Sequence, residues 1–324
     1  MSAGPARLEL HTHLEGSVTP RRLIQLGERH GESARVARCL NAAGDAYVFD
    51  GFAGFLNLYK DVTLLLKTPR DFHAVALDLG EALERDRVGY AEVSLSYGVM
   101  RHWGLDPYPI QQALHEAACR VEAERGVRLR WIPDATRQWG LDAGYRAFEV
   151  AAKAGRALGV VGFGLGGDEG RGPARDFAPL FADARREGLG VTIHAGEVPA
   201  MGPQAAADSV RQAVEDCGAT RIGHGLAVAD DALVMALLAA RGVYVELCPG
   251  SNLRTGAIDS LAQHPLQAFL QAGIPCGLNP DDRTLFGLDM SGELEAARRE
   301  LGLTREQERW MRERTCEAAF ADPA

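Results

Sequence analysis

Eight short β-rich runs that alternate with longer amphipathic stretches constrain the fold of this chain more than any other feature of its sequence. Such alternation is typical of repeated βα units that build a parallel sheet. The runs cover residues 7–10, 89–95, 127–133, 160–165, 190–194, 221–223, 243–247 and 275–279. Eight strands separated by helices predict an α/β fold, a (β/α)8 TIM barrel rather than an open doubly wound sheet.

The sequence also bears on domain organisation. No linker rich in Pro, Gly or Ser divides the 324 residues, so we expect a single domain over residues 1–324. The connection after the first strand, residues 20–87, is unusually long and should hold extra helices, among them the aromatic segment 52–59. An insertion there overhangs the C-terminal mouth of a barrel, where barrel enzymes keep their active sites. A helical C-terminal tail is expected from residue 291 onward.

Charge and cysteine content indicate which kinds of partner and which cellular compartment to expect. The 35 Lys and Arg face 44 Asp and Glu, which gives a formal net charge of −9, whereas a general nucleic-acid binder needs a basic face. Six cysteines without a CxxC pair indicate reduced, buried thiols. Neither a signal peptide nor an apolar run of the ~20 residues needed to span a bilayer is visible. We therefore expect a cytoplasmic protein with neither a membrane nor a nucleic acid as partner.

Ionisable residues gather where the predicted strands end. His11 and His13 follow the first strand, and a spacing of two residues on a strand turns both imidazoles to the same side. His194 ends the fifth strand, and Glu197 comes three residues later. Taken singly, these are more often a surface pair, a core histidine and a solvated carboxylate.

Two further strand ends add to this group. His224 ends the sixth strand between glycines that leave room for a close approach. Asp281 and Asp282 follow the eighth strand, where a pair of acids alone would more simply cap a helix. Because parallel strands of a barrel end at one face, three imidazoles and a carboxylate should meet there, a suitable set for a divalent ion such as Zn2+. Glu197 and His224 would remain for proton transfer.

Six motifs in this order resemble the adenosine deaminase family. They are HTHLEG at 11–16, GFGLGGDE at 162–169, HAGE at 194–197, RIGHG at 221–225, CPGSN at 248–252 and NPDD at 279–282. The resemblance runs from residue 7 to at least residue 290. HAGE together with the acid pair at 281–282 is much more specific to the family than the two histidines at 11 and 13. It implies a zinc-dependent hydrolase that removes ammonia from a 6-aminopurine nucleoside.

The resemblance also implies roles for individual residues. By similarity, the ligands of one Zn2+ are His11, His13, His194 and Asp281. Glu197 matches the residue that donates a proton to ring N1 as water attacks C6. His224 matches the group that orients and deprotonates that water, with Asp281 assisting. The fourth strand contains no lysine that could bridge two metals, so a single ion is favoured.

Three positions are expected to contact the substrate. Asp282 matches the position that contacts purine N7, and Gly167 matches the backbone N–H that contacts N3. Glu15 stands near the ribose 5′-hydroxyl, where adenosine deaminases usually have Asp, and Gly164 stands where they often have another Asp. The longer acid would crowd the 5′ contact, whereas Gly164 opens space.

Three substrates remain open at this point. Adenosine or deoxyadenosine is the first, and aminodeoxyfutalosine, an adenosine with a 5′ aromatic acid extension from a menaquinone route, is the alternative. GFGLGG and the segment GVRLRWIPD at 126–134 resemble deaminases of the latter group. Free adenine is disfavoured, because its deaminases tend to carry Ser-Ser-Glu where residues 167–169 read Gly-Asp-Glu.

Candidates for the remainder of a substrate are aromatic and basic. The aromatic candidates are Phe52, Phe55, Trp103 and Trp139, and the arginine candidates for a carboxylate are Arg101, Arg254 and Arg283. Two other classes of function compete with a deaminase: a barrel that only binds a nucleoside, and a hydrolase of some other amide or ester. Loss of His194, Glu197 or Asp281 would favour the first of these, and all three are present.

Overall fold

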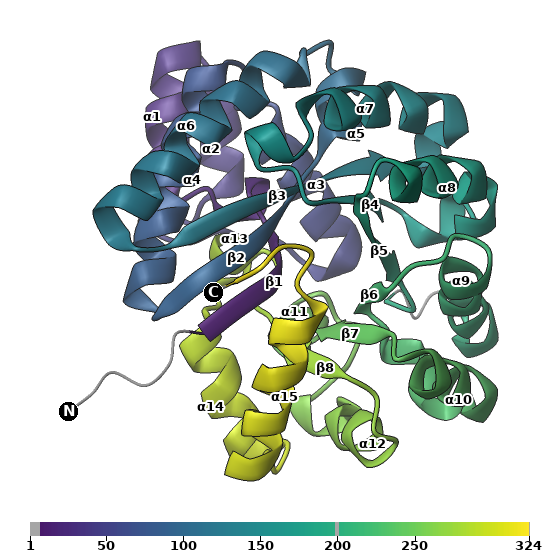
Figure 1. The fold of residues 1–324 in the computed structure, drawn as a ribbon. Helices are drawn as coiled ribbons and strands as arrows, with labels where there is room; N and C mark the ends of the chain where they lie inside the picture. The colour runs from purple at the N-terminus through teal and green to yellow at the C-terminus, as the bar shows by residue number, and fades with distance from the viewer. Residues whose placement is uncertain (1–6, 198–200, 324) are drawn as a thin grey trace.

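The computed structural model describes residues 7–197 and 201–323, and it confirms the predicted (β/α)8 barrel. The eight strands are β1 (Arg7–His13), β2 (Val88–Leu95), β3 (Arg128–Thr136), β4 (Gly162–Gly166), β5 (Gly190–Ala195), β6 (Arg221–His224), β7 (Tyr244–Leu247) and β8 (Cys276–Leu278). Each strand pairs in parallel with the next, in chain order. A bridge between Thr12 and Asp281 joins the last strand to the first, and helices surround the sheet (Figure 1).

The long insertion after β1 and the C-terminal helical tail are both present. The insertion holds α1 (Pro20–His30), α2 (Ser33–Cys39), α3 (Gly51–Thr63) and α4 (Pro69–Arg85). The crossovers hold α5 (Tyr97–His102), α6 (Pro107–Arg125), η2 (Arg137–Trp139), α7 (Gly140–Ala154), α8 (Ala178–Arg186), α9 (Pro203–Glu215), α10 (Ala232–Arg241), α11 (Pro249–Arg254) and α12 (Leu266–Gln271), and α13 (Arg283–Phe286) follows β8. The tail consists of α14 (Met290–Glu300) and α15 (Arg305–Ala318).

Local sequence sets the helix ends. Thr68 and Asp71 form a capping box at the start of α4, and Pro69 occupies its first position, where the missing N–H costs nothing. Asp106 caps α6 through the backbone N–H of its second residue, and Gly126 ends that helix with φ of 68°. None of the helices that the structure describes is long and apolar enough to cross a bilayer.

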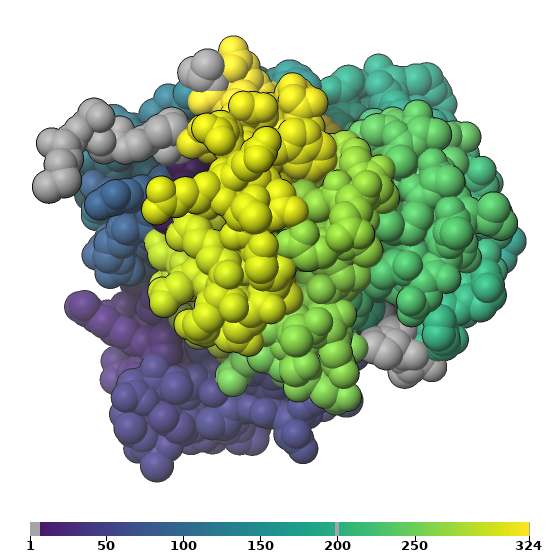
Figure 2. Space-filling view, turned by 90° about the horizontal axis from the view of Figure 1, so that it is seen from below, coloured from purple at the N-terminus to yellow at the C-terminus, as the bar shows by residue number. Residues whose placement is uncertain are grey.

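The tail closes the end of the barrel where the strands begin. A Cβ on Gly190 would lie 2.2 Å from Cδ1 of Phe320, so only glycine allows the ring to pack here. Thr315 of α15 also contacts the hydroxyl of Tyr244 on β7 at 2.9 Å. Figure 2 shows the tail in yellow as a broad part of one face of the molecule.

A network of buried ion pairs around Arg221 lies beside Phe320. Arg221 is 1% exposed and its Nε donates to Glu246 Oε1 at 2.5 Å, while its Nη1 donates to Glu92. Its Nη2 donates to the Leu10 carbonyl at 2.7 Å, and the guanidinium lies 4.0 Å from the centre of the Phe320 ring. One cation thus neutralises two buried carboxylates.

Replacing Arg221 with Met is expected to lower the free energy of unfolding by about 3–5 kcal/mol, because it leaves buried carboxylates without their partner. Chemical denaturation measures the loss. Arg211→Met, which breaks only exposed pairs of α9 with Asp208 and Glu215, is the matched control and should change stability by less than about 1 kcal/mol. If the two variants were equally stable, the buried ion pairs of Arg221 would not stabilise the fold as argued.

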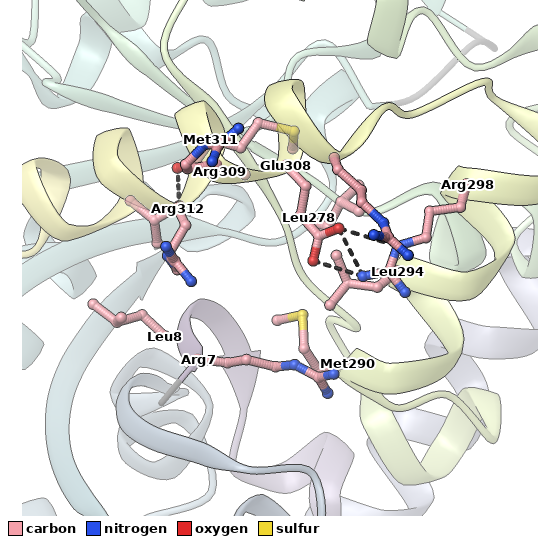
Figure 3. Close-up of a pocket in the computed structure, with 13 residues that line it drawn as sticks. Arg7, Leu8, Leu278, Met290, Leu294, Arg298, Glu308, Arg309, Met311 and Arg312 are labelled. Carbon is pink, nitrogen blue, oxygen red and sulfur yellow. Dashed lines mark hydrogen bonds and ion pairs between the residues drawn. The ribbon is translucent and has the colours of Figure 1, made fainter. Parts of the chain in front are cut away.

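A cavity of about 670 Å3 lies between the tail and strands β1 and β8. Figure 3 shows its arginine-rich wall, in which Arg298 of α14 pairs with Glu308 of α15 at 2.6 Å. None of the residues predicted to carry chemistry lines it.

Candidate active site

The side chains predicted to be metal ligands converge at the C-terminal ends of the strands. His11 and His13 come from β1 and His194 from β5, while Asp281 follows β8. Asp281 Oδ1 lies 3.3 Å from His11 Nε2 and 3.2 Å from His13 Nε2. His13 Nε2 lies 3.2 Å from His194 Nε2. All four donor atoms lie within 4.8 Å of one another, close enough to share one ion.

The chemistry of this cluster fits a divalent cation. His11 Nε2 is buried and faces Asp281 Oδ1 at 3.3 Å without a well-formed hydrogen bond, as expected of two donor atoms that share an ion. Burial and the neighbouring imidazoles hold the pKa of His194 well below 6.5, so its ring is neutral and able to coordinate. Three imidazoles and one carboxylate form a donor set suited to Zn2+.

Glu246 orients the first imidazole and was missed by the sequence analysis. Its Oε2 lies 2.5 Å from His11 Nδ1, which turns Nε2 toward the cluster. Burial alone would raise the pKa of Glu246, but Arg221 and His11 lower it to about 2, so the carboxylate stays charged. The only sequence signal was a single acid inside an apolar strand.

A second possible donor group combines His11, His224, Cys248 and Asp281. Cys248 is buried, and burial followed by the nearby carboxylates raises the pKa of its thiol well above 9. Because only the thiolate is a good ligand, the group with His13 and His194 is the better one.

Two residues of the site hold a strained backbone. Over the described ranges, the non-glycine residues with positive φ are Arg87, His224 (66°) and Asp281 (63°). Ser251 Oγ donates to Asp281 Oδ2 at 2.7 Å, and Thr12 Oγ1 donates to the Asp281 carbonyl at 3.0 Å. Strained conformations persist where surrounding contacts over-determine them, and they cluster at functional sites.

Two glycines permit close approaches here. A Cβ on Gly223 would lie 2.8 Å from Cε1 of His11, so the space expected beside His224 accommodates an imidazole of the cluster. A Cβ on Gly16 would lie 1.9 Å from Oδ1 of Asp282. Any larger residue at these two positions would displace a site side chain.

Glu197 and His224 face each other beside the cluster. Glu197 Oε1 lies 3.7 Å from His224 Nε2, which in turn lies 3.9 Å from Asp281 Oδ2. Burial, reinforced by the charges of Asp281 and Glu169, raises the pKa of Glu197 to about 8. Burial lowers the pKa of His224 to about 3. At neutral pH the pair therefore consists of a protonated carboxyl and a neutral imidazole.

Three residues that position this pair went unrecognised in the sequence. Glu169 accepts the backbone N–H groups of Gly196 at 2.6 Å and Glu197 at 3.1 Å, which fixes the turn of the HAGE segment. The buried Arg137 donates to the carbonyl of His194 at 2.5 Å. Asn252 Nδ2 lies 3.3 Å from His224 Nδ1, so Asn252 orients the ring. Glu169 and Asn252 lay within quoted motifs, but only tertiary contacts reveal what they hold.

A cavity of about 410 Å3 opens from the cluster to solvent. Its inner end is lined by His13, His194, Glu197, His224, Asp281 and Asp282. All four aromatic candidates, Phe52, Phe55, Trp103 and Trp139, line it farther out, and Gly167 lies along its wall with φ of 94°. Burial, followed by the charge of Asp281, raises the pKa of Asp282 well above its usual range.

Glu15 is placed differently from the other substrate candidates. It is buried behind the cavity wall, where its Oε1 accepts the Ser96 backbone N–H at 3.0 Å and its Oε2 the Tyr59 hydroxyl at 3.5 Å. Tyr59 and Ser96 themselves line the cavity. Direct contact of Glu15 with a substrate therefore stays a prediction.

Asp134 is an additional acid that the sequence analysis did not single out. It follows Pro133 on β3, lines the cavity and is buried. Burial and the charge of Glu15 raise its pKa well above 3.8, which favours the protonated carboxyl, a hydrogen-bond donor.

The three arginine candidates lie outside the cavity lining that the structure describes. Arg283 is buried between Glu9 and Asp86, at 2.5 Å from each. Arg254 stacks on Phe49, with 5.4 Å between guanidinium carbon and ring centre. The only lysine or arginine that lines the cavity within the described ranges is Lys60 of α3.

Comparison with known proteins places the chain among deaminases. It is 36% identical over 322 residues to the aminodeoxyfutalosine deaminase of Streptomyces coelicolor, covering 99% of this chain and 81% of that protein. It is 32% identical to the adenine deaminase of Mesorhizobium japonicum, covering 98% and 95%.

Two solved structures have the same fold. The adenine deaminase of Arthrobacter aurescens superposes with a TM-score of 0.85 at 27% identity, covering 98% of this chain and 95% of that one. A zinc-bound amidohydrolase of Burkholderia ambifaria gives 0.85 at 26% identity, covering 98% and 86%. The adenosine deaminase family itself matches residues 6–324. The chain therefore belongs to the adenosine deaminase family of metal-dependent hydrolases, which act on carbon–nitrogen bonds.

Proposed function

We propose that this protein is a zinc-dependent deaminase that hydrolyses the C6 amino group of a 6-aminopurine, and that aminodeoxyfutalosine is its substrate. The observation that carries the proposal is the inner end of the cavity. There a protonated Glu197 and a neutral His224 face each other at 3.7 Å beside four potential metal ligands. Attack on an aromatic ring requires both an activated water and a proton for the ring nitrogen, and these groups supply both.

The residues of the chain divide the chemistry between them. His11, His13, His194 and Asp281 would hold the ion, which when bound makes water nucleophilic at neutral pH. Glu197, protonated because its pKa is about 8, donates to ring N1 as C6 becomes tetrahedral. The neutral ring of His224 has a lone pair that accepts a proton from the attacking water. His224 then passes the proton that it accepted to the C6 amino group, which leaves as ammonia, and the Glu197 carboxylate accepts the remaining proton of the C6 hydroxyl, so both groups regain their starting states.

The purine is oriented by two groups on the cavity wall. Burial and the charge of Asp281 raise the pKa of Asp282 and so favour its protonated carboxyl, which can donate a hydrogen bond to the acceptor N7. The backbone N–H of Gly167 faces N3. With C6 at the metal cluster, the substituent on N9 points toward the mouth of the cavity.

The choice of substrate rests on the relatives and on the size of the cavity. The named relatives favour aminodeoxyfutalosine over adenosine, which the motifs place first: three aminodeoxyfutalosine deaminases match at 35–39% identity, against 32% for an adenosine deaminase. Adenine is the second candidate, since adenine deaminases match at 32–33%. Adenine alone would leave the outer half of the cavity empty.

Ammonia release from a panel of substrates tests the function. The panel contains adenosine, deoxyadenosine, aminodeoxyfutalosine, methylthioadenosine and adenine, each with zinc-loaded protein and with chelator-treated protein. We expect kcat/KM to be highest for aminodeoxyfutalosine, by about tenfold or more, since each 1.4 kcal/mol of extra binding in the transition state gives a factor of ten. We expect turnover to stop in chelator. No ammonia from any member of the panel would refute the proposal.

A further inference from the structure

The outer half of the catalytic cavity has a composition that catalysis at the inner end does not explain. Phe52, Leu56 and Lys60 are spaced by four residues on α3, so they share one face of the helix, and all three line the cavity. Trp103 and Trp139 line it as well.

Two apolar side chains of this wall are unusually exposed. Trp103 is 41% exposed and Leu56 is 37% exposed, which places both among the few large apolar side chains that the described surface leaves open to water. The His102 ring stacks on Trp139 with 4.2 Å between ring centres and 2° between planes, and it meets Trp103 edge-on at 4.9 Å. Exposed apolar surface inside a cavity indicates a ligand that covers it.

The charge on this wall is also uncompensated. Lys60 makes no ion pair with any residue in the described ranges, whereas the chain's other two lysines have partners: Lys67 lies 2.9 Å from Glu32, and Lys153 lies over Tyr108. Asp168, an acid that follows β4 and also lines the cavity, makes no ion pair with Lys60 and accepts the Gly170 backbone N–H at 3.1 Å. An ammonium without an ion-pair partner, in a cavity that is also lined by aromatic side chains, suits an aromatic ring that carries an anion.

We propose that Phe52, Leu56, Trp103 and Trp139 bind an aromatic ring attached to the sugar side of the substrate, and that Lys60 pairs with a carboxylate on that ring. The assignment rests on the proposed function, because it is C6 at the metal cluster that directs the N9 substituent outward. It makes Lys60, rather than any of the three arginines, the residue that selects an acidic substituent.

Lys60→Met tests the charge, with Lys67→Met as the matched control that removes an exposed lysine outside the cavity. The substrates are adenosine, aminodeoxyfutalosine and the carboxamide of aminodeoxyfutalosine, in which a neutral amide replaces the carboxylate. We expect kcat/KM of the Lys60 variant to fall about tenfold for the acid and to change by less than about twofold for the other two. The Lys67 control should match the wild type on all three. Equal effects of Lys60→Met on acid and carboxamide, or none on either, would overturn the pairing.

A binding measurement separates this assignment from the deaminase proposal. Calorimetric titration with the 6-oxo product that carries the aromatic acid requires no turnover. We expect its Kd to rise about tenfold in Lys60→Met, and Trp103→Ala to weaken binding of acid and carboxamide alike. If no substrate is deaminated yet Lys60→Met still weakens product binding, the subsite stands and the deaminase proposal fails. If adenosine and the acid are deaminated equally well and Lys60→Met changes neither, the subsite fails and the deaminase proposal stands.

Discussion

Replacing Glu197 with Gln is expected to lower kcat by roughly 10²–10⁴-fold, the usual contribution of a general acid. Gln has the same shape and still reaches toward His224, but an amide cannot transfer a proton to ring N1. Because Glu197 lies outside the group of four donors, the zinc content of the variant should equal that of the wild type. Steady-state ammonia release and metal analysis of the same preparations measure both.

The pH dependence gives a second view of the same residue. A proton donor acts in its protonated form, and the pKa of Glu197 is raised to about 8. Wild-type kcat/KM should therefore fall as the pH rises through about 8, and the residual activity of Glu197→Gln should lack that fall. Glu187→Gln, at the exposed end of α8, is the control and should behave as the wild type. Turnover retained in Glu197→Gln would instead indicate hydrolysis of some other amide or ester.

The strand ends show how far sequence alone leads to this site. Parallel strands of a barrel end at one face, so histidines and acids placed after separate apolar runs had to lie close together. The structure brings together His11, His13, His194 and Asp281 in that way. The histidines of β1 lie within the strand, which runs to His13 rather than ending at residue 10.

Strand length explains one omission. The third strand was predicted to cover residues 127–133 and so to end at Pro133. Instead β3 continues to Thr136, and Asp134 to Thr136 pair with Gly164 to Gly166 of β4. Asp134 therefore lies on the strand and lines the cavity, one position beyond the end of the predicted strand.

Other omissions are contacts between residues far apart in sequence. His11 and Glu246 are 235 positions apart, and neither has a local pattern that names the other. The arginine candidates for a carboxylate lie outside the cavity lining for a related reason. Arginine was sought from chemistry alone, but Arg283 is buried between Glu9 and Asp86, and the helical insertion turns Lys60 toward the cavity instead.

Replacing His194 with Ala is expected to remove both metal and activity. Loss of one imidazole leaves three donors, one of them a carboxylate, and activity should fall by more than about 10³-fold because the nucleophile depends on the ion. Metal content after dialysis should drop well below one per chain. Since an ion that binds only the folded state stabilises it, added Zn2+ should raise the melting temperature of the wild-type apoprotein and leave that of His194→Ala unchanged.

The control for this variant is His115→Ala, which removes a half-buried imidazole on α6, outside both possible donor groups. It should keep one zinc per chain, full activity and the zinc-dependent rise in melting temperature. The thermal shift separates loss of the site from loss of the fold: a His194 variant that unfolds cooperatively without zinc yet ignores added zinc has lost a ligand. If His194→Ala instead kept full zinc and the thermal shift, the ion would have to bind elsewhere, and the group of His11, His224, Cys248 and Asp281 would become the site to test.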